Sequence, residues 1–553
     1  RPPGARQTTC IRQRIGEESP MRTERFMPQP PRVCDRLMET MPKGGDPTRL
    51  TRNPSLWMAT SPWSEGPVLQ GDMSAQAVVV GSGITGLTAA RLLTEQGVSV
   101  AVIESRRVCS GVTALTTAKV SALQSTVYSG LSATWGDEVA AAYAEANLEG
   151  LGMIRRRVSD ENIECDYRAA SAYTYTESTA GLEKIEAEVE AAQRAGLDVA
   201  FTTESDLPFE IAGAARLDDQ AQFHPRNYCL GLMRGILAGG GAVFEHTKAL
   251  DVDARSGVVT TDRGNINAAL ILIASHVPFV DTGLHLSRMT ASRSYAVSFP
   301  SQSQPPAGMY ISVDEPIRSV RATGDGHVIV GGEAHPVGRD EDTELRYEAL
   351  ESWSKDRFGS PGSDYRWSAH DYRSVDGLPF VGPLGSSERV FMATGFAKWG
   401  MANGTIAAAI MVDLAMGRAG PSAEVFDSRR LALKQAAPDL VKAGAGVVKN
   451  LVTERLLSAD LPDAGGLVPG TGDIVSLDGQ KAAVFRDDRG ELHAVSPICT
   501  HLGCQVGFNS AERTWDCPCH GSRFDVDGTV IHGPALEDLA RATEPDAARS
   551  TPL

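Results

Sequence analysis

Ala77-Val78-Val79-Val80-Gly81-Ser82-Gly83-Ile84-Thr85-Gly86 joins a β-branched run to three spaced glycines. The run predicts a strand, the glycines predict a tight turn, and the apolar pattern from Leu87 to Gln96 predicts a helix. A second apolar run, Ser99 to Ile103, predicts another strand and is followed directly by Glu104. Together these segments predict one βαβ unit of a Rossmann-type α/β fold.

The Gly-x-Gly-x-x-Gly spacing gives each glycine a role in a dinucleotide-binding turn. Gly81 permits the tight turn, Gly83 lets the backbone approach a pyrophosphate, and Gly86 lets the helix pack closely on the strand. The helix N-terminus supplies partial positive charge, and Glu104 is placed to hold ribose hydroxyls. The turn alone does not separate FAD from NAD. The predicted contacts are Gly81, Ser82, Gly83, Ile84, Thr85, Gly86, Glu104, Ser105 and Arg106.

Length and charge restrict the class of protein. The 553 residues exceed what one compact core usually holds, so two or three domains are expected. The formal net charge of −16 argues against a nucleic-acid partner, because such a partner needs a basic surface.

No apolar run approaches the ~20 residues that cross a bilayer, so we expect no transmembrane segment and leave peripheral membrane contact open. Residues 1–50 are rich in Arg and Pro without an export signal, and we predict that they are disordered and that the protein is cytoplasmic.

The middle of the chain alternates helical patterns with buried strand patterns. This order favours an α/β domain over residues 75–420 that is interrupted, roughly at 150–375, by a second β-sheet region. The predicted elements are helices at 137–160, 179–195 and 401–416 and strands at 269–274 and 328–332.

The pattern changes toward the C-terminus. Residues 421–462 are polar and broken by Pro and Gly, which predicts a linker with weak helices. Residues 463–545 contain short strand patterns separated by dense turns, which predict a small all-β domain. Its predicted strands are 482–485, 492–495 and 528–531.

The all-β region contains Cys499-Thr500-His501-Leu502-Gly503-Cys504 and Cys517-Pro518-Cys519-His520-Gly521-Ser522. Each loop offers one Cys and one His, so two thiolates can bind one iron and two imidazoles the other, as in a Rieske [2Fe-2S] centre. Zinc also accepts two Cys and two His, but zinc fingers pair cysteines in one knuckle and histidines in another. The sequence therefore favours the cluster. The predicted ligands are Cys499, His501, Cys517 and His520.

These loops resemble the Rieske domains of cytochrome bc complexes. The resemblance implies a disulfide between Cys504 and Cys519, a hydrogen bond from Ser522 to a cluster sulfur, and a proline loop at Gly533-Pro534-Ala535 over the cluster. A cytoplasmic disulfide is unusual, although burial against the cluster would protect it. Phe524 departs from the pattern, because high-potential members have a tyrosine near the cluster. Since hydrogen bonds to the sulfurs raise the potential, we predict a lower midpoint than theirs.

Three further segments resemble FAD-dependent amino-acid and amine oxidoreductases of the D-amino-acid oxidase and glycine oxidase type. They are Ser110-Gly111-Val112-Thr113-Ala114-Leu115-Thr116-Thr117-Ala118-Lys119, Asp376-Gly377-Leu378-Pro379-Phe380-Val381-Gly382-Pro383 and Thr394-Gly395-Phe396-Ala397-Lys398-Trp399-Gly400-Met401. The resemblance implies that FAD is the cofactor and that the first segment, here called the flavin loop, lies beside the isoalloxazine. The last segment would lead into a helix whose N-terminal amides stabilise negative charge on reduced flavin. The implied contacts are Thr116, Thr117, Ala118, Gly395, Phe396, Gly400 and Met401.

The flavoprotein resemblance spans residues 78–417. With its C-terminal region, the whole chain resembles bacterial FAD-dependent oxidoreductases that carry a C-terminal Rieske domain. Three further segments look typical of that subgroup: Asn53-Pro54-Ser55-Leu56-Trp57, Gln222-Phe223-His224-Pro225 and Phe426-Asp427-Ser428-Arg429.

Three basic residues are candidates for catalysis. Arg321 occupies the kind of place where related amine oxidoreductases bind a substrate carboxylate, which its planar fork suits, and a solvated turn charge is an equal alternative. His335 would lie near the flavin or serve as an ordinary structural histidine. Lys119 would polarise flavin N1 or oxygen, or lie on the surface.

The favoured hypothesis is a dehydrogenase that oxidises a small-molecule reductant, an amine or amino acid, at the flavin and passes electrons singly through the cluster to an unknown one-electron acceptor. One alternative is an NAD(P)H-fed electron-transfer reductase. Its only candidate nucleotide motif, Gly444-Ala445-Gly446-Val447-Val448-Lys449, lacks a preceding strand and a third glycine. The other alternative is a redox sensor that reports to a partner.

Overall fold

Strand β1 (Met73–Val80) lies between β10 (Gly264–Ile273) and β2 (Val100–Ile103), parallel to both, in this computed structural model of the protein. Val78 lies opposite Ile271 of β10 and Ala101 of β2, and all three side chains are buried, as the continuous apolar runs predict. The sheet order is β16 (Phe380–Pro383), β17 (Val390–Thr394), β10, β1, β2 and β7 (Ala242–Phe244), with β9 (Val258–Thr261) on β10 and β8 (Ala249–Asp253) on β9.

The structure describes residues 52–280, 284–339, 342–431, 461–477 and 479–542, all within one compact unit that begins at Pro42. The predicted disordered segment 1–50, most of the predicted linker and the motif Gly444–Lys449 lie outside these ranges. Among the described residues, no helix has both the length and the hydropathy of a membrane span.

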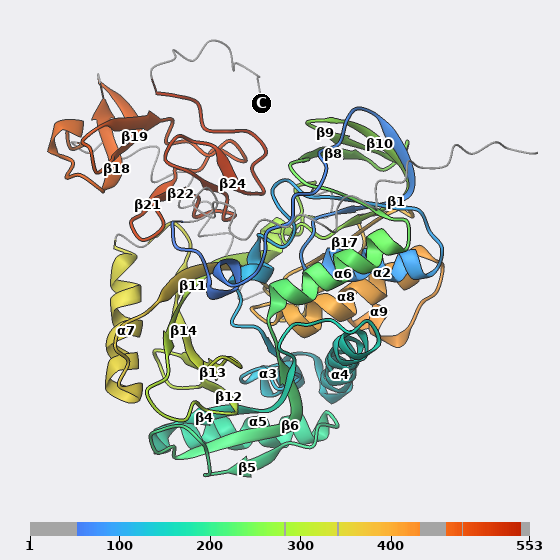
Figure 1. The fold of residues 1–553 in the computed structure, drawn as a ribbon, viewed down its shortest axis with the longest axis vertical. Helices are drawn as coiled ribbons and strands as arrows, with labels where there is room; N and C mark the ends of the chain where they lie inside the picture. Colours follow the sequence, from blue (N-terminus) through green and yellow to red (C-terminus); the bar gives the residue numbers. More distant parts are fainter. Residues whose placement is uncertain (1–51, 281–283, 340–341, 432–460, 478, 543–553) are drawn as a thin grey trace, which may run out of the picture. The chain divides into compact units, whose positions relative to one another are not determined.

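Helices pack against this Rossmann-type sheet (Figure 1). α2 (Ile84–Glu95) follows the glycine turn and contacts α8 (Gly400–Ala415) and α6 (Pro225–Ala238), while α4 (Asp137–Asp160) packs on α8. Small residues allow the close approach: a Cβ at Gly404 of α8 would lie 2.5 Å from the Thr85 hydroxyl of α2.

A second, mostly antiparallel sheet interrupts the first in two stretches, 119–222 and 289–374, rather than in the single stretch predicted roughly at 150–375, because the strands at 242–273 pair within the first sheet. α7 (Glu344–Phe358) packs on β11 and β14, and α5 (Leu182–Arg194) packs on β4 and β6 (Figure 1). The strand order is β15 (Tyr365–Ser374), β11 (Met289–Pro300), β14 (His327–Pro336), β13 (Arg318–Ala322), β12 (Met309–Ser312), β4 (Arg168–Thr176), β6 (Gly213–Gln222) and β3 (Lys119–Val120), with β5 (Ala200–Thr202) on β6.

The C-terminal region is built from two small antiparallel sheets, as the sequence predicts for a Rieske domain. Its core gathers Phe485, Trp515 and Phe524 with the cysteines of the cluster loops. The sheets are β18 (Gly472–Leu477), β19 (Gln480–Arg486) and β20 (Leu492–Val495), and β21 (Gly507–Asn509), β22 (Thr514–Asp516), β23 (Arg523–Phe524) and β24 (Val530–His532).

Most predicted elements differ from the observed ones only at their ends. The helix predicted at 137–160 is α4 in full, whereas α2 begins at Ile84, inside the glycine motif, because Gly83 is its N-cap. The helix predicted at 179–195 is a short 3₁₀ turn, Thr179–Gly181, followed by α5. Helix ends are set by capping, which hydrophobic periodicity does not record. The remaining short helices are α1 (Leu56–Ala59), α3 (Val127–Trp135) and α9 (Pro421–Val425).

Candidate cofactor sites

The glycine turn has the geometry that a dinucleotide requires. Gly81 has a φ of +105°, which L side chains rarely adopt, and its N–H donates to the Ile103 carbonyl at 2.9 Å. A Cβ at Gly86 would lie 1.9 Å from the Gly81 carbonyl oxygen. Gly83 is the N-cap residue of α2. Because glycine has no side chain, it forms no capping hydrogen bond with the N–H groups of the first helical turn.

Glu104 lies at the carboxyl end of β2, where the sequence predicted a ribose-binding acid. Its Oε2 accepts hydrogen bonds from the N–H of Ser82 at 3.1 Å and from the Ser82 hydroxyl at 2.8 Å. Its Oε1 accepts from the Arg106 N–H at 3.0 Å and the Ser105 hydroxyl at 3.2 Å. The carboxylate is therefore fixed beside the glycine turn by the neighbours that the motif places there.

Side chains hold five successive carbonyls of the flavin loop. The Trp57 indole donates to the Thr116 carbonyl at 2.7 Å, and the Trp367 indole donates to the Leu115 carbonyl at 2.8 Å. Nη1 of Arg321 donates to the carbonyls of Thr117 at 3.2 Å and Ala118 at 2.9 Å. The Ser55 hydroxyl donates to the Ala114 carbonyl. Because each carbonyl has a partner, the loop is held in one conformation.

The sequence did not assign these roles. In the sequence, Asn53–Trp57 is only a segment typical of the subgroup. No sequence pattern predicts a role for Trp367, because its partner lies 252 residues away in the chain. Arg321 was predicted to bind a carboxylate. The structure buries its guanidinium against main-chain carbonyls, and the carboxylate role stays a prediction. Its Nη2 has no hydrogen-bond partner among the described residues.

Lys119 lies at the end of the flavin loop and is buried. Its Nζ donates to the Tyr310 carbonyl at 2.9 Å and to the Ser319 hydroxyl. Burial, together with the nearby charge of Arg321, lowers the pKa of Lys119 to about 7. Burial, with repulsion from Arg168, lowers the pKa of Arg321 to about 9. The surface alternative for Lys119 is wrong, and its catalytic role stays a prediction.

The closing segment leads into α8 as the resemblance implied. Ala397 and Lys398 have φ values of 50° and 73°, an uncommon pair for adjacent non-glycine residues, and Gly395 has a φ of 79°. Trp399 is the N-cap residue of α8, and its side chain forms no hydrogen bond with the N–H groups of the first helical turn, which begins at Gly400 and Met401. Phe396 is buried at this turn.

The two predicted cluster loops have matching backbone geometry. The N–H of Cys499 donates to the Cys504 carbonyl at 2.8 Å, and that of Cys517 donates to the Ser522 carbonyl at 2.8 Å. In both loops the glycine, Gly503 or Gly521, donates back to the first cysteine at 3.0 Å, with a φ of 76°. The two loops are therefore equivalent turns that face each other.

This arrangement brings the four predicted ligands together. The thiols of Cys499 and Cys517 hydrogen-bond, and the rings of His501 and His520 lie 5.1 Å apart between centroids. Cys504 and Cys519, whose Cα atoms are 6.5 Å apart, form a disulfide between the loops, so Cys504 and Cys519 have no free thiol for a metal. Two thiols and two imidazoles remain.

Neighbouring residues match the resemblance in part. The Ser522 hydroxyl hydrogen-bonds the Cys499 sulfur and accepts from the Ala535 N–H at 3.0 Å. The proline loop therefore reaches the cluster loops through Ala535, and Phe524 is buried in the same core. The donor set fits a [2Fe-2S] cluster, and the glycine turn, Glu104 and the flavin loop fit FAD. The cluster would supply one-electron chemistry and FAD would supply two-electron chemistry.

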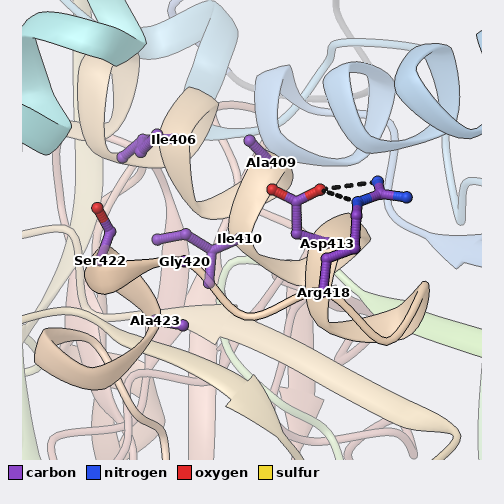
Figure 2. A pocket seen from close by; sticks show the side chains of 8 residues that line it. All are labelled: Ile406, Ala409, Ile410, Asp413, Arg418, Gly420, Ser422 and Ala423. Carbon is purple, nitrogen blue, oxygen red and sulfur yellow. Dashed lines mark hydrogen bonds and ion pairs between the residues drawn. The ribbon is translucent and has the colours of Figure 1, made fainter. Parts of the chain in front are cut away.

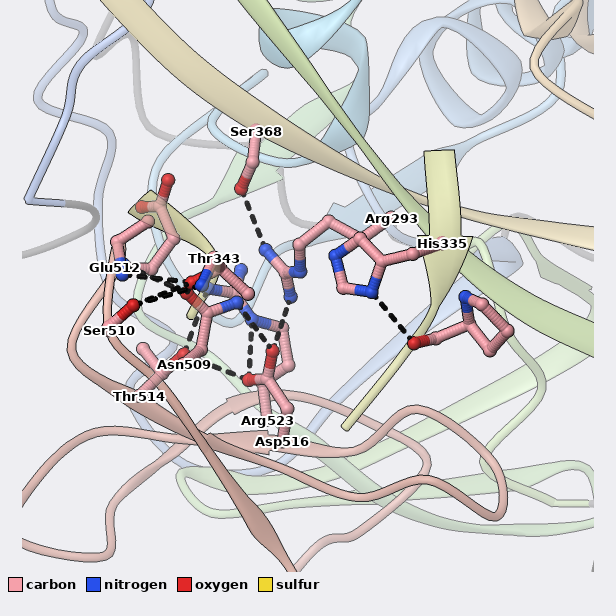
Figure 3. A network of polar contacts seen from close by, with 12 residues as sticks. Arg293, His335, Thr343, Ser368, Asn509, Ser510, Glu512, Thr514, Asp516 and Arg523 are labelled. Atoms are coloured by element: carbon pink, nitrogen blue, oxygen red, sulfur yellow. Dashed lines mark hydrogen bonds and ion pairs between the residues drawn. The ribbon is translucent and has the colours of Figure 1, made fainter. Parts of the chain in front are cut away.

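A buried polar network joins the second sheet to the cluster-bearing region (Figure 3). Nη2 of Arg293 on β11 lies 2.9 Å from an oxygen of Asp516, the residue before Cys517, and Nε of Arg523 lies 3.3 Å from the other oxygen. The Thr343 hydroxyl donates to the Asn509 amide oxygen at 2.8 Å, and the Tyr347 hydroxyl donates to Glu512 at 2.8 Å.

His335 lies beside this network rather than in the glycine turn or flavin loop (Figure 3). Its Nδ1 donates to the Pro336 carbonyl at 2.9 Å, so Nε2 accepts from the Tyr295 hydroxyl at 3.0 Å. Both ring nitrogens are satisfied, which fits the structural alternative better than the catalytic one.

One surface pocket lies apart from the predicted sites. It is lined by α8 and the segment that follows it, and Arg418 pairs with Asp413 at 2.8 Å inside it (Figure 2). None of the predicted site residues lines it.

Comparison with known families agrees with this geometry. The model of the "FAD dependent oxidoreductase" family matches residues 76–414, and that of the "Rieske [2Fe-2S] domain" matches residues 461–543. The chain belongs to the FAD-dependent oxidoreductase family. It is an oxidoreductase that binds FAD and, in its Rieske domain, a [2Fe-2S] cluster.

Individual relatives match either most of the chain or a short part of it. YhfW of Bacillus subtilis (strain 168), which carries the name of a Rieske 2Fe-2S iron-sulfur protein, is 36% identical over 87% of this chain and 96% of its own length. The cytochrome b6-f complex iron-sulfur subunit 1 of Trichormus variabilis is 46% identical over 11% of this chain and 35% of its own.

Solved structures share the fold of the flavoprotein region. Glycine oxidase of Geobacillus kaustophilus has a TM-score of 0.56 at 15% identity, over 65% of this chain and 99% of its own. L-proline dehydrogenase of P. horikoshii has a TM-score of 0.53 at 16% identity, over 66% of this chain and 98% of its own.

Proposed function

We propose that the protein is a dehydrogenase of an amine or amino acid that passes the electrons singly through the Rieske cluster to a one-electron acceptor. FAD takes two electrons at once and releases them one at a time, whereas the cluster carries one. The protein's part is to bind the substrate, exclude water and hold the two cofactor sites close together.

The contact between the two regions is the observation that carries this proposal. Gly338, which follows β14, touches the segment that bears the cluster ligand Cys517. A Cβ at Gly338 would lie 2.6 Å from the Asp516 carbonyl and 2.9 Å from the Pro518 nitrogen. Such backbone contact, with the buried ion pair of Arg293 and Asp516, supports a fixed position of the cluster on the flavoprotein.

An exposed residue of one cluster loop supports an outlet to a partner. Leu502, next to the ligand His501, is 57% exposed, although the cysteines beside it are buried. An electron acceptor that docks on the exposed Leu502 would lie next to His501 in the chain.

The charge around the flavin loop supports a carboxylate-bearing substrate. Arg321 and Lys119 are buried basic groups, and neither forms an ion pair within the part of the chain that the structure describes. A bound carboxylate would favour the charged form of both groups. The structural neighbours named for glycine and L-proline oxidation share the fold and are consistent with this class.

Anaerobic screening of amines and amino acids tests the proposal. We expect one of them to bleach the flavin absorbance and then to give the electron paramagnetic resonance signal of a reduced cluster. In Cys517→Ser protein the flavin should still bleach, and the cluster signal should be absent. Flavin reduction without cluster reduction in the wild type would contradict the proposal, and rapid bleaching by NADH instead would favour the reductase alternative.

A further inference from the structure

Tyr372 on β15 touches both cofactor regions. Its main-chain carbonyl accepts a hydrogen bond at 3.0 Å from the N–H of Ala397, in the segment that closes the flavin site. Its hydroxyl donates at 2.9 Å to the carbonyl of His520, a predicted cluster ligand. A single buried residue therefore spans the distance from the flavin segment to the cluster loop through two hydrogen bonds.

The surroundings of Tyr372 are closely packed. Its ring lies 5.0 Å from that of His276 and 5.1 Å from that of His370, between centroids. The cluster loop packs directly on these rings: a Cβ at Gly521 would lie 2.4 Å from His370 Nε2 and 2.9 Å from the Tyr372 hydroxyl. The ring of His532 on β24 lies 5.2 Å from that of His370, so aromatic groups of both regions share this contact.

A small shared cavity supports the same adjacency. It is lined by the flavin-loop residues Ser110 to Val112 and Leu115, by His370, and by residues of the Rieske region, Arg523, Ile531 and His532. The flavin loop and the Rieske strands are therefore two walls of one space.

We propose that Tyr372 couples the flavin site to the cluster and positions the His520 loop for electron transfer. The proposal rests on the proposed function. The rate of electron transfer falls steeply with the distance between the two cofactors. Covalent and hydrogen bonds transmit the electron better than a through-space contact does. Each substrate oxidation yields two electrons, which reach the acceptor in two successive one-electron steps. The flavin proton goes to solvent. The Tyr372 phenol is neither oxidised nor deprotonated.

Tyr372→Phe removes the hydroxyl and keeps the ring. Tyr347→Phe is the matched control, because its hydroxyl also crosses to the Rieske region but ends on Glu512 rather than on a cluster ligand. Each holoprotein is reduced with dithionite and mixed anaerobically with ferricyanide, and oxidation of cluster and flavin is followed separately by absorbance. We expect flavin oxidation to slow several-fold in Tyr372→Phe and to stay unchanged in Tyr347→Phe.

Amide hydrogen exchange supplies a measurement that does not depend on activity. Loss of one buried hydrogen bond should speed exchange of peptides covering residues 517–522 by about fivefold in Tyr372→Phe, whereas Tyr347→Phe should affect residues 509–514 instead. Unchanged flavin oxidation in Tyr372→Phe, or equal slowing in both variants, would overturn the proposal. Comparing Cys517→Ser with the wild type separates failure of this proposal from failure of the proposed function. If Cys517→Ser, which lacks the cluster, oxidises its flavin as fast as the wild type does, the route through the cluster itself is wrong.

Discussion

The Arg293 guanidinium and the Asp516 carboxylate form a 2.9 Å ion pair in which both side chains are almost fully buried, at 0% and 1% exposure. Asp516 also accepts hydrogen bonds from Asn509 at 3.1 Å and Thr514 at 2.8 Å. The Asp516 side of the pair is well supplied with hydrogen bonds, whereas among the described residues only Nη1 of Arg293 forms one, to the Ser368 hydroxyl at 2.7 Å, so the carboxylate is the better-satisfied partner. Because Asp516 precedes Cys517, the pair fixes the start of a cluster loop.

Replacing Asp516 should destabilise the protein strongly. Asp516→Ala leaves Arg293 and Arg523 as buried charges without their carboxylate, and breaking a buried pair costs about 3–5 kcal/mol. Urea unfolding followed by fluorescence measures this loss. Asp488→Ala is the control, because Asp488 pairs with Arg513 at the surface, and it should have little effect. Equal midpoints for the two variants would show that the pair does not hold the regions together.

Arg321→Lys separates a loop-holding role from a carboxylate-binding role. Lysine keeps the charge but cannot reach the Thr117 and Ala118 carbonyls with the same fork, so we expect FAD affinity to fall about fivefold to tenfold, for the loss of about 1 kcal/mol or more. The fraction of FAD released on dilution measures this change. A raised KM for the substrate with unchanged FAD retention would instead support the carboxylate role.

Local patterns could be predicted from the sequence because their physics is local. The βαβ unit and the two cluster loops depend on residues within about thirty positions of one another. Strand patterns, glycine turns and ligand spacings can be recognised over such short stretches of sequence. The contacts of Trp57 with Thr116, of Arg293 with Asp516 and of Tyr372 with His520 join residues 59 to 223 positions apart. No spacing rule predicts such contacts.

His335 shows the limit for single residues. A histidine near a strand end is equally compatible with catalysis and with packing, and only its contacts with Tyr295 and Pro336 favour packing. The residues that hold the flavin loop are likewise Trp and Arg in ordinary strand and helix patterns. Their role follows from the tertiary arrangement alone.

Gly86→Ala should prevent FAD binding. The added Cβ would lie 1.9 Å from the Gly81 carbonyl, so α2 would have to move away from the predicted pyrophosphate-binding turn. Flavin absorbance per protein measures cofactor content, and we expect a near-complete loss. Gly130→Ala in α3 is the control, because nothing lies within 4 Å of its Cβ position, and it should raise stability by about 0.5–1 kcal/mol. A Gly86→Ala protein with full flavin content would contradict the dinucleotide assignment.

Residues beside the cluster should set its potential. Ser522→Ala removes a hydrogen bond to the Cys499 sulfur and should lower the midpoint, since such bonds stabilise the reduced cluster. Phe524→Tyr supplies a hydroxyl in the same core and should raise the midpoint. Redox titration followed by circular dichroism measures both. A wild-type midpoint at the top of the Rieske range would contradict the prediction drawn from Phe524.

His224 should make stability depend on pH. Burial lowers the pKa of His224 to about 4, and its Nδ1 accepts from the Asn227 N–H at the start of α6. In the unfolded chain a histidine has a pKa near ~6.5, so below that pH the unfolded state binds the proton first. The contribution of His224 is therefore complete above about pH 6.5 and falls by up to about 1.4 kcal/mol per pH unit between there and about pH 4.

His224→Asn should remove this part of the pH dependence, because asparagine can still cap the helix and does not titrate. Urea unfolding at pH 7.5 and pH 5 measures the difference for each protein. The matched control is His246→Asn, an exposed position with a φ of 48° that asparagine accepts, and it should keep the wild-type dependence. If His224→Asn loses as much stability on acidification as the wild type does, His224 is not the group responsible.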